Sequence, residues 1–276
     1  MTLNVVNCKG WRIRGLQHFD ESANFALELI VINRAMIYLY RIYQWCIVAP
    51  IMLVYSIITA LITIVGCLFD QDYWGYYPAK WWARVWCWLH LVRVKVVGRQ
   101  LIDHETSYVF VANHQGAYDI FSIYGFLGHN FKWMMRKGIT NIPLVGTACR
   151  MAGHILVDTH TAQGLRDTMA AAKKKLHHGG MSIVVFPEGR RTDTGLMGPF
   201  KNGAFKLALE FGLPVVPITI DGSYRVMPRS TFNVTPGTIT LTFHEPIEHT
   251  GGNDIAQVSH QCRTVIQQDL PADQRD

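Results

Sequence analysis

Two short polar segments in this chain carry residue types that can do chemistry together. His114 and Asp119 lie within residues 113–119, Asn-His-Gln-Gly-Ala-Tyr-Asp, and four residues separate them. Residues 186–191, Phe-Pro-Glu-Gly-Arg-Arg, follow about seventy positions later. A carboxylate on one imidazole nitrogen leaves the other free as a general base, and guanidinium groups pair with phosphate oxygens. The pattern indicates transfer of a group onto a hydroxyl of a phosphorylated acceptor.

The context of His114 decides whether it is catalytic, because a lone histidine is more often structural. It follows an apolar run at 108–112 and precedes a helix start, where the charge of Asp119 suits the helix dipole. No Gly-x-Ser-x-Gly segment and no cysteine stand near it. We therefore expect His114 to activate a substrate hydroxyl and not a protein nucleophile. The alternative for Arg190 and Arg191 is a solvated polar turn.

From about residue 91 onward, short apolar runs alternate with helical patterns. The expected strands are 92–97, 108–112, 182–186, 215–220 and, as an edge strand, 238–243; the expected helices are 119–127, 162–178, 202–211 and 254–268. This alternation predicts an α/β fold with a largely parallel central sheet flanked by helices. Ligands gather at the carboxyl ends of such strands, where both polar segments lie.

An apolar N-terminal segment precedes this domain. Residues 42–69 carry no formal charge and are long enough to span a bilayer as a helix. Residues 74–88 then hold five of the eight tryptophans, interleaved with Lys80 and Arg84. That composition favours the head-group boundary, although a helix packed on the catalytic core is the alternative. We predict a membrane-anchoring helical segment at 1–90 and an α/β domain at 91–276.

The orientation of the apolar run stays open in the sequence. Basic residues lie on both sides of it, so the positive-inside rule does not separate the two sides. A shallow hairpin bent near Pro50 or Gly66 would leave both ends in the cytosol, and a single span is the alternative. No cleavable signal peptide is expected, because the first thirty residues lack an uninterrupted apolar core. We expect a membrane protein whose active site faces the cytoplasm.

Composition narrows the class of partner. The 276 residues are 49% apolar and 17% charged, with a net charge of +6, a pI near 9.0 and a mean hydropathy of +0.12. The basic excess suits lipid head groups, a phosphorylated substrate or an acidic carrier, and a solvated surface is the alternative. Nucleic acid is disfavoured, because the longest basic run is only residues 173–175. The cysteines and histidines show no metal-ligand spacing, so neither a metal nor another cofactor is expected.

The order of the polar segments resembles a known family. Residues 113–119 look like the first motif of the glycerolipid acyltransferases, the 1-acyl-glycerol-3-phosphate acyltransferase family, and residues 153–158, 186–191 and 213–217 are similar to its later blocks. Lys137 and residues 141–146 also fall where this family has a basic residue and a proline-containing block. The resemblance covers residues 92–243. Thr159 departs from the arginine, and Arg190 from the threonine, that the family commonly has.

The resemblance implies a glycerol-3-phosphate acyltransferase-like fold and acyl transfer from acyl-coenzyme A or acyl-carrier protein. The acceptor would be the sn-2 hydroxyl of 1-acyl-glycerol-3-phosphate, and the product phosphatidic acid. His114 would be the base, oriented by Asp119, and backbone N–H groups near Gly189 or the His114 turn would stabilise the oxyanion. The residues expected to bind substrate are Glu188, Gly189, Arg190, Arg191 and Lys137. The alternatives are another lyso-lipid acceptor, such as a lyso-ornithine lipid, and a non-enzymatic lipid-binding protein.

Overall fold

The computed structural model describes residues 32–157, 164, 168, 170–173, 181–248 and 254–275. The chain divides into two compact units, 1–50 and 51–276. Residues 158 and 159 and most of the helix expected at 162–178 lie outside the described residues. The division predicted at residue 90 stays a prediction.

The described part of the first unit is helical. Its last turns form a π-helix, η1 (Tyr43–Val48), in which the N–H of Ala49 bonds to the carbonyl of Gln44. Pro50 follows and has no N–H to donate, so the wider turn accommodates it without a break. Helix runs from Ile32 to Gly66, long and apolar enough to cross a membrane by length and composition. The helix is therefore not interrupted at Pro50, which was one of the two positions considered for a hairpin.

The second unit contains a largely parallel sheet, as predicted. Its described strands are β1 (Val92–Val97), β2 (Val109–Ala112), β3 (Phe131–Arg136), β4 (Ile155–Val157), β5 (Ser182–Val185), β6 (Val215–Asp221) and β7 (Gly237–Phe243). Their spatial order is β1-β7-β6-β2-β5-β3-β4, and only β6 and β7 pair antiparallel. Because β2 and β5 are parallel neighbours, their carboxyl ends meet at one edge of the sheet.

One strand lies elsewhere than its pattern predicts. Residues 238–243 were expected at an edge, yet β7 pairs with β1 on one side and β6 on the other. The edge is β1, where the exposed Arg93 and Lys95 discourage pairing with another chain. Strands β3 and β4 were not expected as strands, because β3 mixes Lys132 and Arg136 with apolar residues and β4 is three residues long.

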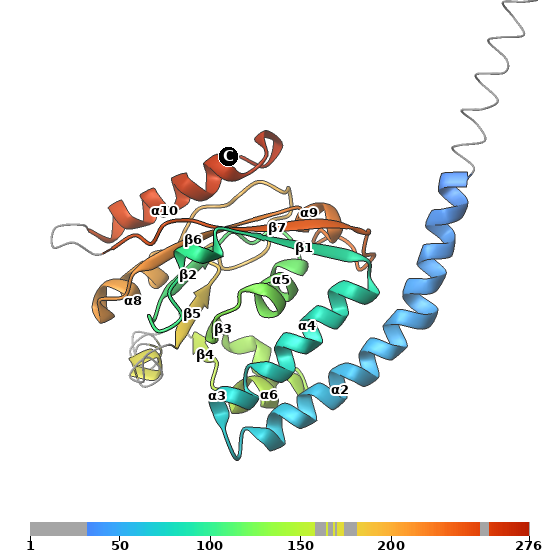
Figure 1. Cartoon of the computed structure of the whole chain (residues 1–276), viewed down its shortest axis with the longest axis horizontal. Helices are drawn as coiled ribbons and strands as arrows, with labels where there is room; N and C mark the ends of the chain where they lie inside the picture. The colour runs from blue at the N-terminus through green and yellow to red at the C-terminus, as the bar shows by residue number, and fades with distance from the viewer. Residues whose placement is uncertain are drawn as a thin grey trace, which may run out of the picture. The chain divides into compact units, whose positions relative to one another are not determined.

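Helices cover both faces of the sheet (Figure 1). The described ones in this unit are the greater part of α2 (Ala49–Gly66), then α3 (Gln71–Trp74), α4 (Tyr77–Leu89), α5 (Tyr118–Phe126), α6 (Val145–Met151), α8 (Gly203–Phe211), α9 (Ser223–Val226) and α10 (Ile255–Asp269), with 3-10 turns η2 (Arg99–Leu101), η3 (Lys137–Asn141) and η4 (Ala272–Gln274). Strand β2 shows how two cores arise: Phe110 packs with α4 and α5, whereas Val109 and Val111 pack with α8 and α10. Burial on both faces explains its continuous apolar sequence.

The chain reverses direction between α2 and α4, near Gly66, the other bend that we considered. A Cβ at Gly66 would lie 2.4 Å from the Trp74 ring, so only glycine allows this approach. Across the reversal, Trp82 Nε1 donates to Ser56 Oγ at 2.8 Å. The Trp-rich helix α4 therefore has two faces. Trp82 packs on the core, while Trp88 is 73% exposed.

Candidate active site

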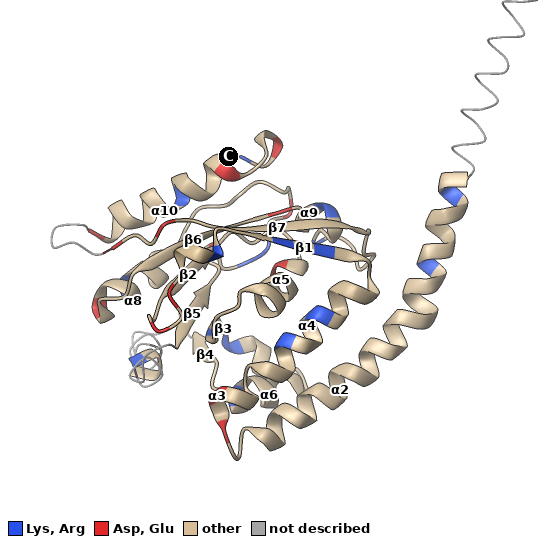
Figure 2. Cartoon of the chain, viewed as in Figure 1, with Lys and Arg blue, Asp and Glu red and all other residues tan. Residues whose placement is uncertain are grey.

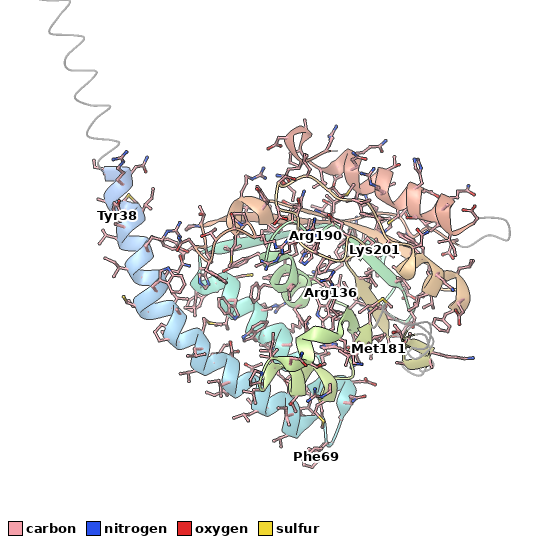
Figure 3. All side chains as sticks on the ribbon, turned by 180° about the vertical axis from the view of Figure 1, so that it is seen from behind. Tyr38, Phe69, Arg136, Met181, Arg190 and Lys201 are labelled. Carbon is pink, nitrogen blue, oxygen red and sulfur yellow. The ribbon has the colours of Figure 1, made fainter. Side chains whose placement is uncertain are left out.

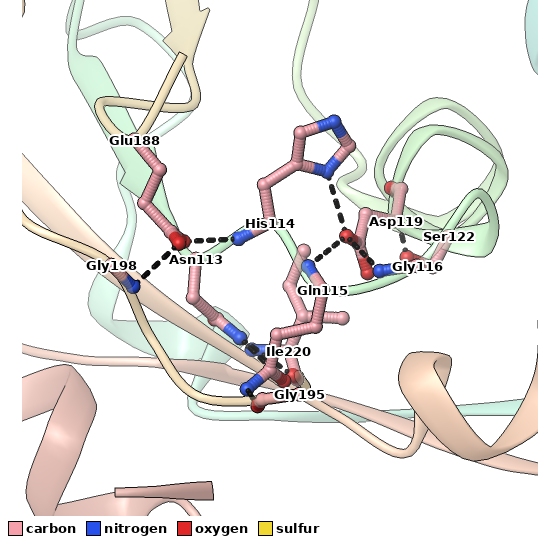
Figure 4. A network of polar contacts seen from close by, with 10 residues as sticks. All are labelled: Asn113, His114, Gln115, Gly116, Asp119, Ser122, Glu188, Gly195, Gly198 and Ile220. Atoms are coloured by element: carbon pink, nitrogen blue, oxygen red, sulfur yellow. Dashed lines mark hydrogen bonds and ion pairs between the residues drawn. The ribbon is translucent and has the colours of Figure 1, made fainter. Parts of the chain in front are cut away.

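His114 and Glu188 meet where β2 and β5 end side by side. The His114 backbone N–H donates to Glu188 Oε1 at 2.7 Å, and the Thr192 N–H donates to the His114 carbonyl at 3.1 Å. Two segments about seventy residues apart are thus held together through the main-chain atoms of His114, and Figure 4 shows the bond to Glu188. The parallel pairing of their strands makes this meeting geometrically necessary.

Asp119 holds both the imidazole and the turn that carries it. Its Oδ2 accepts from His114 Nδ1 at 2.8 Å and from the backbone N–H groups of Gln115 and Gly116 at 2.7 and 2.9 Å. The carboxylate is fully buried in the first turn of α5, where the helix dipole favours an anion. Because the carboxylate accepts from Nδ1, the proton of neutral His114 sits on that nitrogen and the Nε2 lone pair faces outward.

The second nitrogen of His114 is available. Nε2 has no hydrogen-bond partner among the residues that the structure describes, and Figure 4 shows it on the far side of the ring from Asp119. The side chain is 12% exposed, so a ligand in the adjoining cavity can reach it. The ring also stacks on Phe186, with centroids 4.0 Å apart and planes 8° from parallel. Stacking and the carboxylate together fix the ring plane.

Two buried amides support the turn, and they escaped the sequence reasoning. Asn113 Nδ2 donates to the carbonyl of Ile220 at 2.9 Å, and Asn113 Oδ1 accepts from the Ile220 N–H at 2.8 Å. The side chain thereby extends the β2–β6 ladder after the backbone has turned away. Gln115 Nε2 donates to the carbonyl of Gly195 at 2.7 Å and ties the turn to a further loop. Their position after an apolar strand was the available signal.

Glu188 binds backbone and not arginine. Its two oxygens accept from the N–H groups of His114 and Gly198, both at 2.7 Å, and the residue is 8% exposed. Burial raises the pKa of Glu188 to about 7, although the two backbone donors pull that pKa down. The geometry places Glu188 between the His114 turn and the loop before α8. Its expected role in binding substrate stays a prediction.

Four of the backbone donors that we expected at the oxyanion are already occupied, and the role of the other N–H groups near Gly189 stays a prediction. The N–H groups of His114, Gln115 and Gly116 donate to carboxylates, and the Gly189 N–H donates to the carbonyl of Phe186 at 3.0 Å. Because each of these donors is used inside the protein, none is free to face a developing charge. Lys201 lies nearby instead: a Cβ on Gly189 would stand 2.8 Å from Lys201 Nζ.

His114 opens onto a cavity of about 790 Å³ whose lining changes character along its length. Basic side chains line one part: Arg136, Arg190, Arg191, Lys201 and Arg229. Arg136, Arg190 and Lys201 are labelled in Figure 3. The sequence pointed to the two arginines after Gly189 but missed the other three cations. Lys137 is not among the lining residues, whereas its neighbour Arg136 is.

The rest of the lining is mostly apolar, and several of its residues come from helices. It includes Ala60 of α2, Trp82 of α4, Ile120 of α5 and Ala148 of α6. Figure 2 shows Lys and Arg positions in blue along α4 and β1, whereas α2 carries none. The space can therefore take a ligand with an anionic end and a long apolar end beside His114. No group of three or more potential metal ligands occurs in the described part of the chain.

The fold and these motifs define a class. Residues 93–221 match the family model described as Acyltransferase, and this part of the chain is an acyltransferase-family domain. The predicted resemblance to the glycerolipid acyltransferases is confirmed. A 1-acyl-sn-glycerol-3-phosphate acyltransferase of Brassica napus is 31% identical over 211 residues, which are 74% of this chain and 60% of that protein. The chain spans about three fifths of the length of such plant relatives.

A bacterial relative and a solved structure extend the comparison. The 1-acyl-sn-glycerol-3-phosphate acyltransferase of Salmonella typhimurium is 24% identical over 224 residues, covering 78% of this chain and 91% of that protein. The 1-acyl-sn-glycerophosphate acyltransferase PlsC of Thermotoga maritima superposes with a TM-score of 0.67 at 24% identity, over 86% of this chain and 96% of that one. At this identity the solved structure supports the fold.

Proposed function

We propose that the protein transfers an acyl group from a thioester to the sn-2 hydroxyl of 1-acyl-glycerol-3-phosphate, forming phosphatidic acid. The observation that carries this proposal is the position of His114. Its unbonded Nε2 faces a cavity that is cationic in one part and apolar in the other. The relatives named above carry this activity in their names, and the acceptor has the matching anionic and apolar ends.

The proposed chemistry needs one proton transfer and no protein nucleophile. His114 Nε2 removes the proton of the acceptor hydroxyl while that oxygen attacks the thioester carbon, and Asp119 stabilises the imidazolium that forms. General base catalysis of this kind contributes about 10²–10⁴-fold. Collapse of the tetrahedral intermediate breaks the carbon–sulfur bond, and the thiolate leaves with the proton that His114 returns. Neither a metal nor another cofactor takes part in these steps.

The cationic part of the cavity is the proposed phosphate site. Arg191 is half-buried and Arg190 is 70% exposed, so Arg191 is the better-desolvated partner for a phosphate. Lys201 approaches Gly189 so closely that a side chain at Gly189 would displace it, which gives Gly189 its proposed role. Arg136 and Lys201 complete the set, and Lys137 contributes long-range charge at most.

The outer surface of α2 supports membrane association. From residue 51 onward most of its large apolar side chains are exposed, including Leu53, Val54 and Val65 at 65, 57 and 55%, while Met52 is buried. Such a surface suits contact with lipid, and α4 adds the exposed Trp81 and Trp88 beside Lys80 and Arg84. We infer that acceptor and product exchange with the bilayer and that the active site faces the cytoplasm. The thioester carrier, coenzyme A or acyl-carrier protein, would arrive from water.

The test is acyl transfer by the detergent-solubilised full-length chain, wild type beside His114→Ala. Lysophosphatidic acid is the acceptor, and acyl-coenzyme A and acyl-carrier protein are compared as donors. We expect phosphatidic acid from the wild type and at least a 10³-fold lower rate from a folded His114→Ala variant. His129→Ala, whose ring bonds backbone carbonyls away from the cavity, is the matched control. Substantial turnover by His114→Ala would refute the base, and inactivity of the wild type with both donors would move the search to other lyso-lipid acceptors.

A further inference from the structure

Two of the five basic side chains that line the cavity are not used by the proposed acceptor site. The acceptor phosphate takes Arg191, Lys201 and Arg136 in that proposal. Arg190 and Arg229 also line the cavity and remain without a role. Among the described residues no acidic side chain lines it, whereas a phosphate monoester carries at most about two negative charges. The surplus of positive charge therefore suits a second anion.

Asp193 holds these two arginines together. Arg229 Nη1 lies 3.1 Å from Asp193 Oδ1, and Arg190 Nη1 lies 3.9 Å from Asp193 Oδ2. The side chains of Arg190, Asp193 and Arg229 are 70, 59 and 42% exposed, so a ligand can reach the group from water. Because two guanidinium groups share one carboxylate, one positive charge and most of their N–H donors are left for that ligand.

The two segments that carry these arginines are both fixed to the turn that carries His114. The Thr192 N–H donates to the His114 carbonyl at 3.1 Å. The Ala117 N–H, further along the turn, donates to the Met227 carbonyl at 3.3 Å. Thr192 lies two residues after one arginine, and Met227 lies two residues before the other. The arginine pair therefore keeps a defined position relative to the base.

We propose that Arg190 and Arg229 bind the phosphate of the donor's phosphopantetheine arm. The inference rests on the proposed function, because it needs a thioester donor beside His114. Coenzyme A and acyl-carrier protein both carry the thioester at one end of this arm and a phosphate at the other. The phosphate end of either donor stays in water, which agrees with the exposure of the pair, whereas the half-buried Arg191 suits the acceptor phosphate.

The first test measures binding, so that it does not depend on turnover. Pantetheine and phosphopantetheine differ only in this phosphate, and each is titrated calorimetrically into the full-length protein in detergent. We expect phosphopantetheine to bind about tenfold more tightly to the wild type. Arg229→Ala and, independently, Arg190→Ala should each remove most of that preference. Arg225→Ala, the matched control, should retain it, because this arginine pairs with Asp221 and does not line the cavity.

Turnover then identifies which donor supplies the phosphate. With lysophosphatidic acid as acceptor, Arg229→Ala should lower kcat/KM about tenfold for acyl-coenzyme A, for acyl-carrier protein or for both. The donor that is affected is the source. The KM for lysophosphatidic acid should stay at the wild-type value, in contrast to Arg191→Ala. A raised acceptor KM with unchanged kinetics for both donors would assign Arg229 to the acceptor and overturn the inference.

The outcomes separate this inference from the proposed function. Equal binding of pantetheine and phosphopantetheine by an active wild type would overturn the subsite and leave the acyl transfer standing. A preference for the phosphate that survives both Arg229→Ala and Arg190→Ala would also overturn the subsite. A preference lost in these variants, in a protein that does not acylate lysophosphatidic acid, would support the subsite and contradict the proposed acceptor. Melting temperatures identify any variant that fails to fold, and the other variant then decides.

Discussion

The turn that carries His114 and the helix that walls the cavity, α2, use polar side chains in opposite ways. In the turn, three buried polar side chains hydrogen-bond to specific backbone atoms. Asp119 accepts from two N–H groups, Asn113 accepts from the Ile220 N–H, and Gln115 donates to the Gly195 carbonyl. In α2, the small and hydroxyl-bearing residues Thr59, Ala60 and Thr63 are buried together with Met52, while most of the large aliphatic residues are exposed.

The inward face of α2 is Ser56, Thr59, Ala60 and Thr63, a spacing of three and four that keeps one side of the helix toward the cavity. Small side chains there leave volume for a ligand, whereas Leu or Ile would fill it. The outward aliphatic face would be unfavourable in water. The comparison shows that the turn is built for precision in one histidine ring, and that α2 is built for space on one side and lipid on the other.

Asp119→Asn breaks the turn and should have the largest effect. The amide cannot hold His114 Nδ1–H and two backbone N–H groups as a carboxylate does, so the ring loses its tautomer and its counter-charge. We expect kcat to fall by about 10³–10⁴-fold with binding of the acceptor little changed. Asp273→Asn, on the exposed C-terminal turn, is the control and should match the wild type. Near-normal kcat in Asp119→Asn would show that the pair is structural.

Ala60→Phe changes the side of α2 that lines the cavity, and Leu61→Phe changes its outer side for comparison. The added ring would occupy acyl space, so kcat/KM for long-chain donors should fall by about 10- to 100-fold while short-chain donors are less affected. Leu61→Phe changes the adjacent residue, which is 49% exposed on the outer face, and should have little effect on either donor. If both variants behave alike across a series of donor chain lengths, α2 does not set the acyl-chain length that the enzyme prefers.

Arg191→Ala sharpens the comparison at the cationic part of the cavity. Loss of a charge-assisted hydrogen bond to phosphate should raise the KM for the acceptor by about tenfold. Arg190→Ala should raise it less, because Arg190 is 70% exposed and faces Asp193 at 3.9 Å. Arg225→Ala serves as control, since its guanidinium pairs with Asp221 and does not line the cavity. An unchanged KM in Arg191→Ala would place the phosphate elsewhere.

Glu188→Gln should give the smallest effect, a change in the pH dependence of stability. Burial raises the pKa of Glu188 to about 7 from an ordinary 4.5, so the folded protein holds this proton more tightly than the unfolded chain does. The stability it contributes is fully present below about pH 4.5 and is lost as pH rises toward 7. Over that range the melting temperature of the wild type should fall by roughly 5 °C relative to Glu188→Gln.

A constant difference between the two melting curves would mean that the pKa of Glu188 is not raised. Glu210→Gln, an exposed glutamate on α8, provides the control and should run parallel to the wild type.

Much of the fold could be predicted from the sequence because local patterns agree with it. Strand β1 alternates, β2 and β5 are short apolar runs, and α10 begins at Asp254, which caps the helix by accepting from the Gln257 N–H. The wrong edge assignment of β7 has a physical cause. Alternation shows only that one face of a strand is more polar than the other. It does not tell whether a neighbouring strand pairs with each of its two edges.

The residues of the site also divide into those that the sequence indicated and those that it did not. Sequence alone indicated His114, Asp119 and the guanidinium pair after Gly189, because residue type and spacing along one turn carry that information. It could not indicate Lys201, Arg136 or Arg229. These residues come from the loop before α8, from β3 and from the turn after α9, and only the packing of those parts brings them to one cavity.

Which acceptors bind the backbone N–H groups of the site likewise depends on the tertiary structure. Nothing local to the His114 turn tells that Glu188, which follows β5, will accept from the His114 N–H, whereas the Gly189 N–H donates to the nearby carbonyl of Phe186. What the sequence by itself determined is the order of strands and helices, the base and its carboxylate, and the apolar run before them, since these depend on neighbours along the chain. The tertiary structure decided which charges and donors share the cavity, because that depends on distances through space.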